Sequence, residues 1–132
     1  MDPNSEAVVR GYLMTIEKSA TKETLEAFLH NDIHQYEFPS RMNPNGRCRK
    51  KAEMLADCEK GKALLTVQEY RIKSLISDGN RVSAETEWVG TLAIPLGSLN
   101  AGDRMRVNFG VFFRIQDGKI IEQNNYDCIH PW

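Results

Sequence analysis

Hydrophobic and polar residues follow their clearest pattern near the end of the chain, over residues 104–129 (RMRVNFGVFFRIQDGKIIEQNNYDCI). Two apolar-rich runs are separated by one turn sequence, Gln116-Asp117-Gly118, and this arrangement predicts a long β-hairpin. The register of the turn decides which side chains share a face, because a shift of one residue moves every side chain of a strand to the opposite face.

Two registers of this hairpin have to be weighed. A two-residue Asp-Gly turn would pair Phe112 with Gln123, whereas a three-residue turn with Gly118 in the left-handed conformation would pair Val111 with Gln123. We favour the second register, because it places the apolar residues of one strand beside three polar residues of the other. The expected inner face then consists of Val107, Phe109, Val111, Phe113, Ile121, Gln123, Asn125 and Asp127. A sheet that only covers a core does not need three successive polar residues there, so we interpret this face as the wall of a pocket.

The rest of the chain alternates between helical and strand-like spacing. Apolar residues at helical spacing predict a first helix that begins near Asp2, Pro3 or Ser5 and carries Tyr12 on its buried side. Thr21 is the expected N-cap of a second helix. The other expected elements are helices over 22–30 and 50–60, strands over 33–38, 65–76 and 81–93, and loops over 40–49 and 94–103.

This order of elements predicts an α+β domain that spans residues 1–132. We expect a curved antiparallel sheet wrapped around three helices of the N-terminal half, so that sheet and helices form a cone with an internal pocket. A chain of 132 residues is long enough to bury about two-thirds of its unfolded surface as one domain.

Candidate site residues also lie on elements before the hairpin. Strand 33–38 carries His34 and Tyr36 on one face and Gln35 and Glu37 on the other. We expect the His34 face to point inward because it bears the aromatic residues. A single inward histidine is more often structural than catalytic, and both interpretations stay open. Trp88 lies on the expected inner face of strand 81–93.

Two further features have alternative interpretations. Tyr12 is either a core aromatic residue or a hydrogen-bond donor into a cavity. The basic cluster, which consists of Arg47, Arg49, Lys50 and Lys51, is either the solvated start of a helix, which we favour, or an anion-binding site.

Composition limits the classes of function. Charged residues make up 27% and hydrophobic residues 41% of the chain, and the formal net charge is −1, so nucleic-acid binding has little support. No apolar run approaches the ~20 residues that cross a membrane, and no secretion signal is visible. The three cysteines form no C-x-x-C pair and the three histidines show no metal-ligand spacing, so we expect a cytoplasmic protein without a metal.

Three stretches carry a resemblance to a known superfamily: VVRGYL in the first helix, YEFP in the first strand, and GVFFRIQDGKIIEQNNYD in the hairpin. With the order of elements, they resemble the nuclear transport factor 2-like superfamily over essentially the whole chain. That superfamily includes ketosteroid isomerases, limonene-epoxide hydrolases and SnoaL-like polyketide cyclases. The resemblance identifies the fold far better than the reaction, because one such scaffold supports many functions.

The resemblance to ketosteroid isomerases leaves most of their catalytic positions unmatched. Their proton-transferring Asp precedes the proline of the first strand, where this chain has Phe38, and their oxyanion-binding Asp corresponds to Val111. Only the tyrosine of the first helix is kept, as Tyr12. Without a base at the expected position, isomerase chemistry by that route is not supported.

The other two families leave one candidate acid. The Arg and two Asp residues of the epoxide hydrolases correspond to Thr86, Trp88 and Asn125. The acid/base Asp of SnoaL-like cyclases also corresponds to Asn125, whose amide exchanges no proton at neutral pH. Asp127, two residues along the same face, is the residue that could take its place.

Three hypotheses follow. The first is an enzyme that uses acid/base chemistry, without a cofactor, on a small, largely apolar, oxygenated molecule. Its candidate residues are Asp127 and His34 for catalysis and Tyr12, Tyr36, Trp88, Gln123 and Asn125 for substrate binding. The second is a non-catalytic module that binds such a molecule, and the third is a dimerisation domain. In all three the resemblance implies a homodimer formed through the outer face of the sheet, because members of the superfamily commonly dimerise there; the corresponding residues are Ser83, Glu85, Glu87, Phe112 and Arg114.

Overall fold

The computed structural model describes residues 4–18 and 20–132, which form three helices and six strands. The elements are α1 (Ser5–Glu17), α2 (Lys22–Glu26), β1 (Leu29–Glu37), β2 (Arg47–Lys50), α3 (Lys51–Gly61), β3 (Leu65–Asp78), β4 (Arg81–Leu92), β5 (Arg104–Gln116) and β6 (Lys119–Ile129). Asp2 and Pro3, two of the residues expected to begin the first helix, lie outside the described residues.

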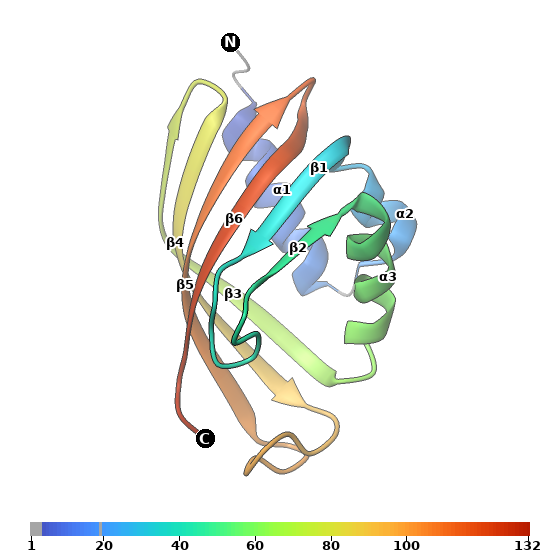
Figure 1. Cartoon of the computed structure of the whole chain (residues 1–132), viewed down its shortest axis with the longest axis vertical. Helices are drawn as coiled ribbons and strands as arrows, with labels where there is room; N and C mark the ends of the chain where they lie inside the picture. Colours follow the sequence, from blue (N-terminus) through green and yellow to red (C-terminus); the bar gives the residue numbers. More distant parts are fainter. Residues whose placement is uncertain (1–3, 19) are drawn as a thin grey trace.

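The six strands form one curved sheet in the order β2-β1-β6-β5-β4-β3, with the helices on its concave side (Figure 1). The predicted α+β class and cone-like form are confirmed. The expectation of an entirely antiparallel sheet is wrong, because β1 runs parallel to β6. Strand β2 lies in a segment expected to be a loop and forms one edge of the sheet.

Helix α2 begins where the sequence predicts but ends earlier, whereas α3 agrees with the predicted helix over 50–60 to within one residue at each end. The side chain of Thr21 accepts a 3.1 Å hydrogen bond from the backbone N–H of Thr24, which confirms the predicted cap of α2. Helix α2 nevertheless ends at Glu26 instead of near residue 30. The reason is tertiary: Leu29 already pairs with Ile120 of β6, and both side chains are fully buried.

The turn between β5 and β6 differs from the preferred register. Asp117 and Gly118 have φ angles of 55° and 72°, so the hairpin closes with a two-residue turn of the type I′ kind and not with a three-residue turn. A bulge at Ile121 follows, because the next pair along β5 and β6 after Ile115–Ile120 skips one residue of β6.

This bulge restores the predicted faces although the predicted pairs are shifted by two residues. The pairs beyond the bulge are Phe113–Gln123, Val111–Asn125 and Phe109–Asp127. The inner face therefore contains every expected residue except Ile121, whose place beside Ile115 is taken by the fully buried Ile120.

The core lies mainly at the end of the sheet near this turn. Its fully buried residues there include Val9, Leu29, Val82, Ile115 and Ile120. Farther along β5 and β6 the inner face becomes partly polar, and it is at this end that the structure leaves an internal space.

Candidate functional site

A cavity of about 440 Å³ lies between the concave side of the sheet and helices α1 and α3. Phe109 and Val111 of β5 supply apolar wall. The polar part of the wall includes Tyr12, Gln35, Glu37, Arg49, Gln123 and Asn125. This volume is in the range of sites that hold drug-sized molecules.

A chain of hydrogen bonds joins α1 to β6 inside the cavity. The Tyr12 hydroxyl donates to Gln123 Oε1 at 3.0 Å, and Gln123 Nε2 donates to Asn125 Oδ1 at 2.9 Å. Burial raises the pKa of Tyr12 to about 12, so its hydroxyl keeps its proton at neutral pH. The structure thus brings together three of the predicted site residues, and Tyr12 is a donor that orients an amide.

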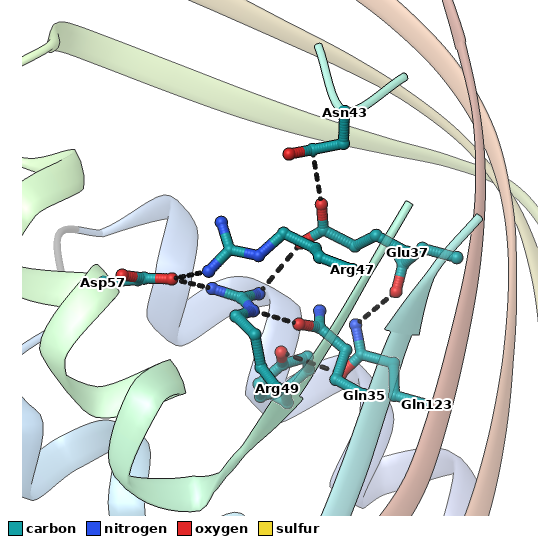
Figure 2. A network of polar contacts seen from close by, with 9 residues as sticks. Gln35, Glu37, Asn43, Arg47, Arg49, Asp57 and Gln123 are labelled. Carbon is teal, nitrogen blue, oxygen red and sulfur yellow. Dashed lines mark hydrogen bonds and ion pairs between the residues drawn. The ribbon is translucent and has the colours of Figure 1, made fainter. Parts of the chain in front are cut away.

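A second polar group is centred on Arg49, whose guanidinium reaches inward from β2 (Figure 2). Its Nε donates to Gln35 Oε1 at 2.6 Å, while its terminal nitrogens lie 3.1 Å from Glu37 Oε1 and 2.9 Å from Asp57 Oδ2. Glu37 also accepts a 2.9 Å hydrogen bond from Asn43 Nδ2. Each of the three guanidinium nitrogens therefore has a partner, and Arg49 is held in one orientation.

The charges of this group balance. Asp57 on α3 binds Arg47 as well as Arg49, so two guanidinium groups face the carboxylates of Asp57 and Glu37. Burial alone would raise the pKa of Asp57, but hydrogen bonds and charge from Arg49 and Arg47 hold the pKa of that carboxyl below its usual value. The favoured interpretation of the basic cluster as a solvated helix start is wrong for Arg49, whose side chain is only 15% exposed.

Asp127 lies on the inner face of β6, paired with Phe109 of β5. Burial, followed by the negative charge of Glu37, raises the pKa of Asp127 to about 6. The charge of Asp127 in turn contributes to the raised pKa of Tyr70, after burial and Tyr12, and Tyr70 and Glu37 both line the cavity. Asp127 is not itself among the residues that line the cavity, but its carboxyl group interacts electrostatically with these two residues that do, and it changes charge near neutral pH.

The expected inward orientation of His34 and Tyr36 is wrong. Both side chains are exposed on the outer face of β1, while Gln35, which is 4% exposed, and Glu37 point inward. The physical reason is that the inward polar groups find partners in Arg49 and Asn43, whereas the aromatic rings of this strand find partners outside. Phe38, the residue that follows β1, stacks on Tyr126 of β6 at a centroid distance of 4.4 Å.

Trp88 lies on the inner face of β4 as expected, but it is not part of the cavity wall. Its indole N–H donates to Gln68 Oε1 at 3.0 Å, and Gln68 Nε2 donates to the Ile16 carbonyl at 3.1 Å. Gln68 itself lines the cavity. Trp88 therefore helps to tie β3 to the end of α1 and does not offer its ring to a ligand.

Sequence reasoning missed Gln35, Glu37 and Arg49. One signal could have found the first two: Ile33, an apolar residue with 1% exposure, lies two residues before Gln35 and therefore shares the face of β1 that carries Gln35 and Glu37. No local signal identified Arg49, because its inward position depends on the pairing of β2 with β1, where Arg49 lies opposite Gln35.

Within residues 4–18 and 20–132, no group of three or more His, Cys, Asp or Glu side chains is arranged to hold a metal ion. The helices of that same part of the chain lack the length and apolar character of a membrane span. The polar groups of the cavity can donate hydrogen bonds from amides and hold the Asp57 carboxylate ionised beside Arg49, and Asp127 on the same inner face of the sheet can exchange a proton.

Comparison with known proteins agrees with this geometry. A family model described as the SnoaL-like domain matches residues 9–123. Among solved structures, AclR from Streptomyces galilaeus, described as a candidate hydroxylase, superposes with a TM-score of 0.78 at 16% identity over 97% of this chain and 81% of its own. No relative was found among curated protein sequences.

Two other solved structures extend the comparison. A limonene-epoxide-hydrolase-like enzyme from M. tuberculosis has a TM-score of 0.75 at 15% identity, over 95% of this chain and 83% of its own. A SnoaL-like polyketide cyclase from Agrobacterium tumefaciens has a TM-score of 0.70 at 18% identity, over 94% and 91%. At such identities the likeness demonstrates a shared fold, as the resemblance of the sequence implied.

Proposed function

The chain belongs to the SnoaL-like domain family, and from this premise we propose that it is an enzyme that applies acid/base chemistry to a small, uncharged, largely apolar oxygenated molecule. Asp127 is the acid/base group in this proposal, and the cavity of about 440 Å³ is the substrate site. No cofactor takes part in the proposed chemistry.

One observation carries the proposal: Asp127 is a partly buried carboxyl group on the inner face of β6, and burial, followed by the charge of Glu37 in the cavity wall, raises its pKa to about 6. An acid/base group is most effective when its pKa lies near the working pH, because both protonation states are then well populated. Glu37 contributes to this pKa because Arg49 and Asn43 hold its carboxylate close by.

The remaining residues bind the substrate in this proposal. Tyr12, Gln123 and Asn125 form an oriented polar strip, while Phe109 and Val111 contact apolar parts of the molecule. His34 and Tyr36 have no role, because they lie on the outer face. The balanced charges around Arg49 favour an uncharged substrate over an anion.

The test starts from a thermal-shift screen of wild-type protein against aromatic and terpenoid ketones, epoxides and polyketide-like compounds. A ligand at about 100 times its dissociation constant adds about 2.7 kcal/mol of stability and is readily detected. Each hit is then incubated with the protein and followed by chromatography. We expect conversion by the wild type and about 10²–10⁴-fold slower conversion by Asp127→Asn.

Asp78→Asn is the matched control, because Asp78 ends β3 and is exposed, far along the chain from the site. This control should convert substrate at the wild-type rate. Equal rates for Asp127→Asn and the wild type would refute the assignment of Asp127. A ligand that binds tightly and is never converted would favour a binding module instead.

A further inference from the structure

Two amide groups in the cavity have orientations that their neighbours determine. Gln35 Oε1 accepts the hydrogen bond from Arg49 Nε at 2.6 Å. A guanidinium group only donates, so the oxygen of Gln35 has to face Arg49 and its NH₂ group has to point the other way. Figure 2 shows this arrangement, with the Gln35 oxygen directed at Arg49.

Asn125 is oriented through Gln123 and Tyr12. The proton of the Tyr12 hydroxyl, on a residue only 3% exposed, needs an acceptor, and Gln123 Oε1 provides it at 3.0 Å. Gln123 Nε2 then donates to Asn125 Oδ1 at 2.9 Å. The reverse polarity would leave the Tyr12 proton without an acceptor among the described residues. The oxygen of Asn125 is therefore occupied, and its NH₂ group is the last donor in this series of hydrogen bonds.

Neither NH₂ group has a hydrogen-bond partner in the part of the chain that the structure describes. Among the described residues that are not exposed, only one unpaired side-chain nitrogen or oxygen atom is completely enclosed by protein, and that atom is Thr86 Oγ1. The nitrogens of Gln35 and Asn125 are also unpaired, so they must keep some accessible surface. The cavity that both residues line provides this surface.

The two residues that carry these donors are close neighbours in the sheet. In the parallel pair of β1 and β6, Gln35 lies opposite Gln123, and Glu37 lies opposite Asn125. Gln35 and Asn125 are thus diagonal neighbours on the same inner face, a spacing of about 7–8 Å between backbones that amide side chains can bridge through one shared acceptor.

The chemistry of this pair selects one kind of partner. A carbonyl oxygen has two lone pairs and accepts two N–H donors at once. A carboxylate would meet the negative charge of Glu37 while Arg49 is already bound to Glu37 and Asp57. An alcohol would bring a proton that neither NH₂ group can accept.

We propose that the Gln35 and Asn125 amides together form a binding site for the carbonyl oxygen of an uncharged ketone, with Arg49 and Tyr12 as the positioning residues that orient them. The inference rests on the proposed function in naming the substrate class of the same cavity. Two N–H donors also stabilise an oxygen that gains negative charge, which suits a reaction assisted by Asp127.

The experiment measures equilibrium binding of three matched probes, 1-tetralone, 1-tetralol and tetralin, by calorimetry with the full chain. We expect the wild type to bind the ketone about tenfold more tightly than the hydrocarbon, and more tightly than the alcohol. The carbonyl carbon of ¹³C-labelled 1-tetralone should move downfield in its NMR spectrum on binding. Equal affinities for ketone and hydrocarbon, with an unshifted carbonyl signal, would overturn the proposal.

Two variants locate the site. Asn125→Asp and Gln35→Glu each keep an oxygen acceptor for the existing donor, Gln123 or Arg49, while they replace the NH₂ donor by oxygen. Both should abolish the ketone preference. Asn124→Asp is the matched control, because it adds the same charge on the opposite face of β6, where Asn124 contacts Glu122. Loss of the preference in this control as well would refute the assignment.

The two proposals can fail separately. Asp127→Asn tests turnover, and under the present inference it keeps the preference for the ketone because its amide does not alter Gln35 or Asn125. Should Asn125→Asp fail to fold, Gln35→Glu and the carbonyl signal of the wild-type complex still decide the question. A ketone preference that survives both donor substitutions would place the carbonyl elsewhere in the cavity and overturn the inference.

Discussion

The hydroxyl group of Tyr12 donates a 3.0 Å hydrogen bond to Oε1 of Gln123, and this bond joins α1 to β6 across 111 positions of the chain. Gln123 is only 4% exposed, so its oxygen has little access to bulk water if the bond is lost. The contact therefore stabilises the fold and at the same time orients the amides of the cavity.

Tyr12→Phe should lower the free energy of unfolding by about 1–3 kcal/mol, because it leaves the buried Gln123 oxygen without a donor. Tyr70→Phe is the matched control. The hydroxyl of Tyr70 has no hydrogen-bond partner among the described residues, although the ring packs edge-on against Phe109. We expect Tyr70→Phe to change stability by less than about 0.5 kcal/mol. Urea denaturation checks both, and equal losses would contradict the role given to Tyr12.

Asp127 should destabilise the fold at neutral pH. Burial, followed by the charge of Glu37, raises its pKa from 3.8 to about 6, so between these values the folded state binds more protons than the unfolded state. The contribution of Asp127 to stability consequently falls as the pH rises through this window and stays low above it.

Asp127→Asn removes that cost, because the amide is uncharged at every pH. The variant should be more stable than the wild type by about 1–2 kcal/mol at pH 7.5, after allowance for partial exposure, with little gain near pH 4. Denaturation at both pH values measures this, with Asp78→Asn as the control. A gain of the same size at both pH values would show that charge is not the cause.

Glu37 should influence the protonation of Asp127 directly. Glu37→Gln removes the negative charge that helps to raise the pKa of Asp127, so the pKa should move down towards its ordinary value. The ¹³C signal of the Asp127 carboxyl group, followed during a pH titration, reports this without any substrate. Glu59→Gln, on α3 and part of a surface ion pair with Lys62, is the control and should leave the titration unchanged.

The outer face of the sheet presents exposed apolar side chains, and we propose that two copies of the chain associate there. Phe112 and Tyr126 are 49% and 46% exposed, and Ile76 beside them is 70% exposed. Patches of this kind commonly mark protein interfaces. Phe112→Glu should convert a dimer to a monomer in sedimentation equilibrium. Met42→Glu, which alters an exposed residue of the loop after β1, should leave the dimer intact. A monomeric wild type would refute this proposal.

Several features of the site could be predicted because they depend on residues close together in the chain. Gln123, Asn125 and Asp127 alternate along one strand, so they share a face whatever the strand pairs with. The same reasoning placed Tyr12 on the buried side of α1, since helical spacing is also local.

The register of the hairpin could not be obtained in this way. The turn sequence is compatible with two- and three-residue turns, and the bulge at Ile121 leaves no local sign. It arises because Ile120 fills the core beside Leu29, and that contact exists only when β1 lies next to β6.

By itself, then, the sequence determined the helices, every strand except β2, the polar inner face of β6 and the family resemblance. Tertiary structure alone decided that Gln35 and Glu37 point inward in place of His34 and Tyr36. Alternation along a strand defines two faces but not which one is buried. That choice depends on free energy: polar groups are buried where distant partners satisfy them, and Arg49 of β2 is such a partner.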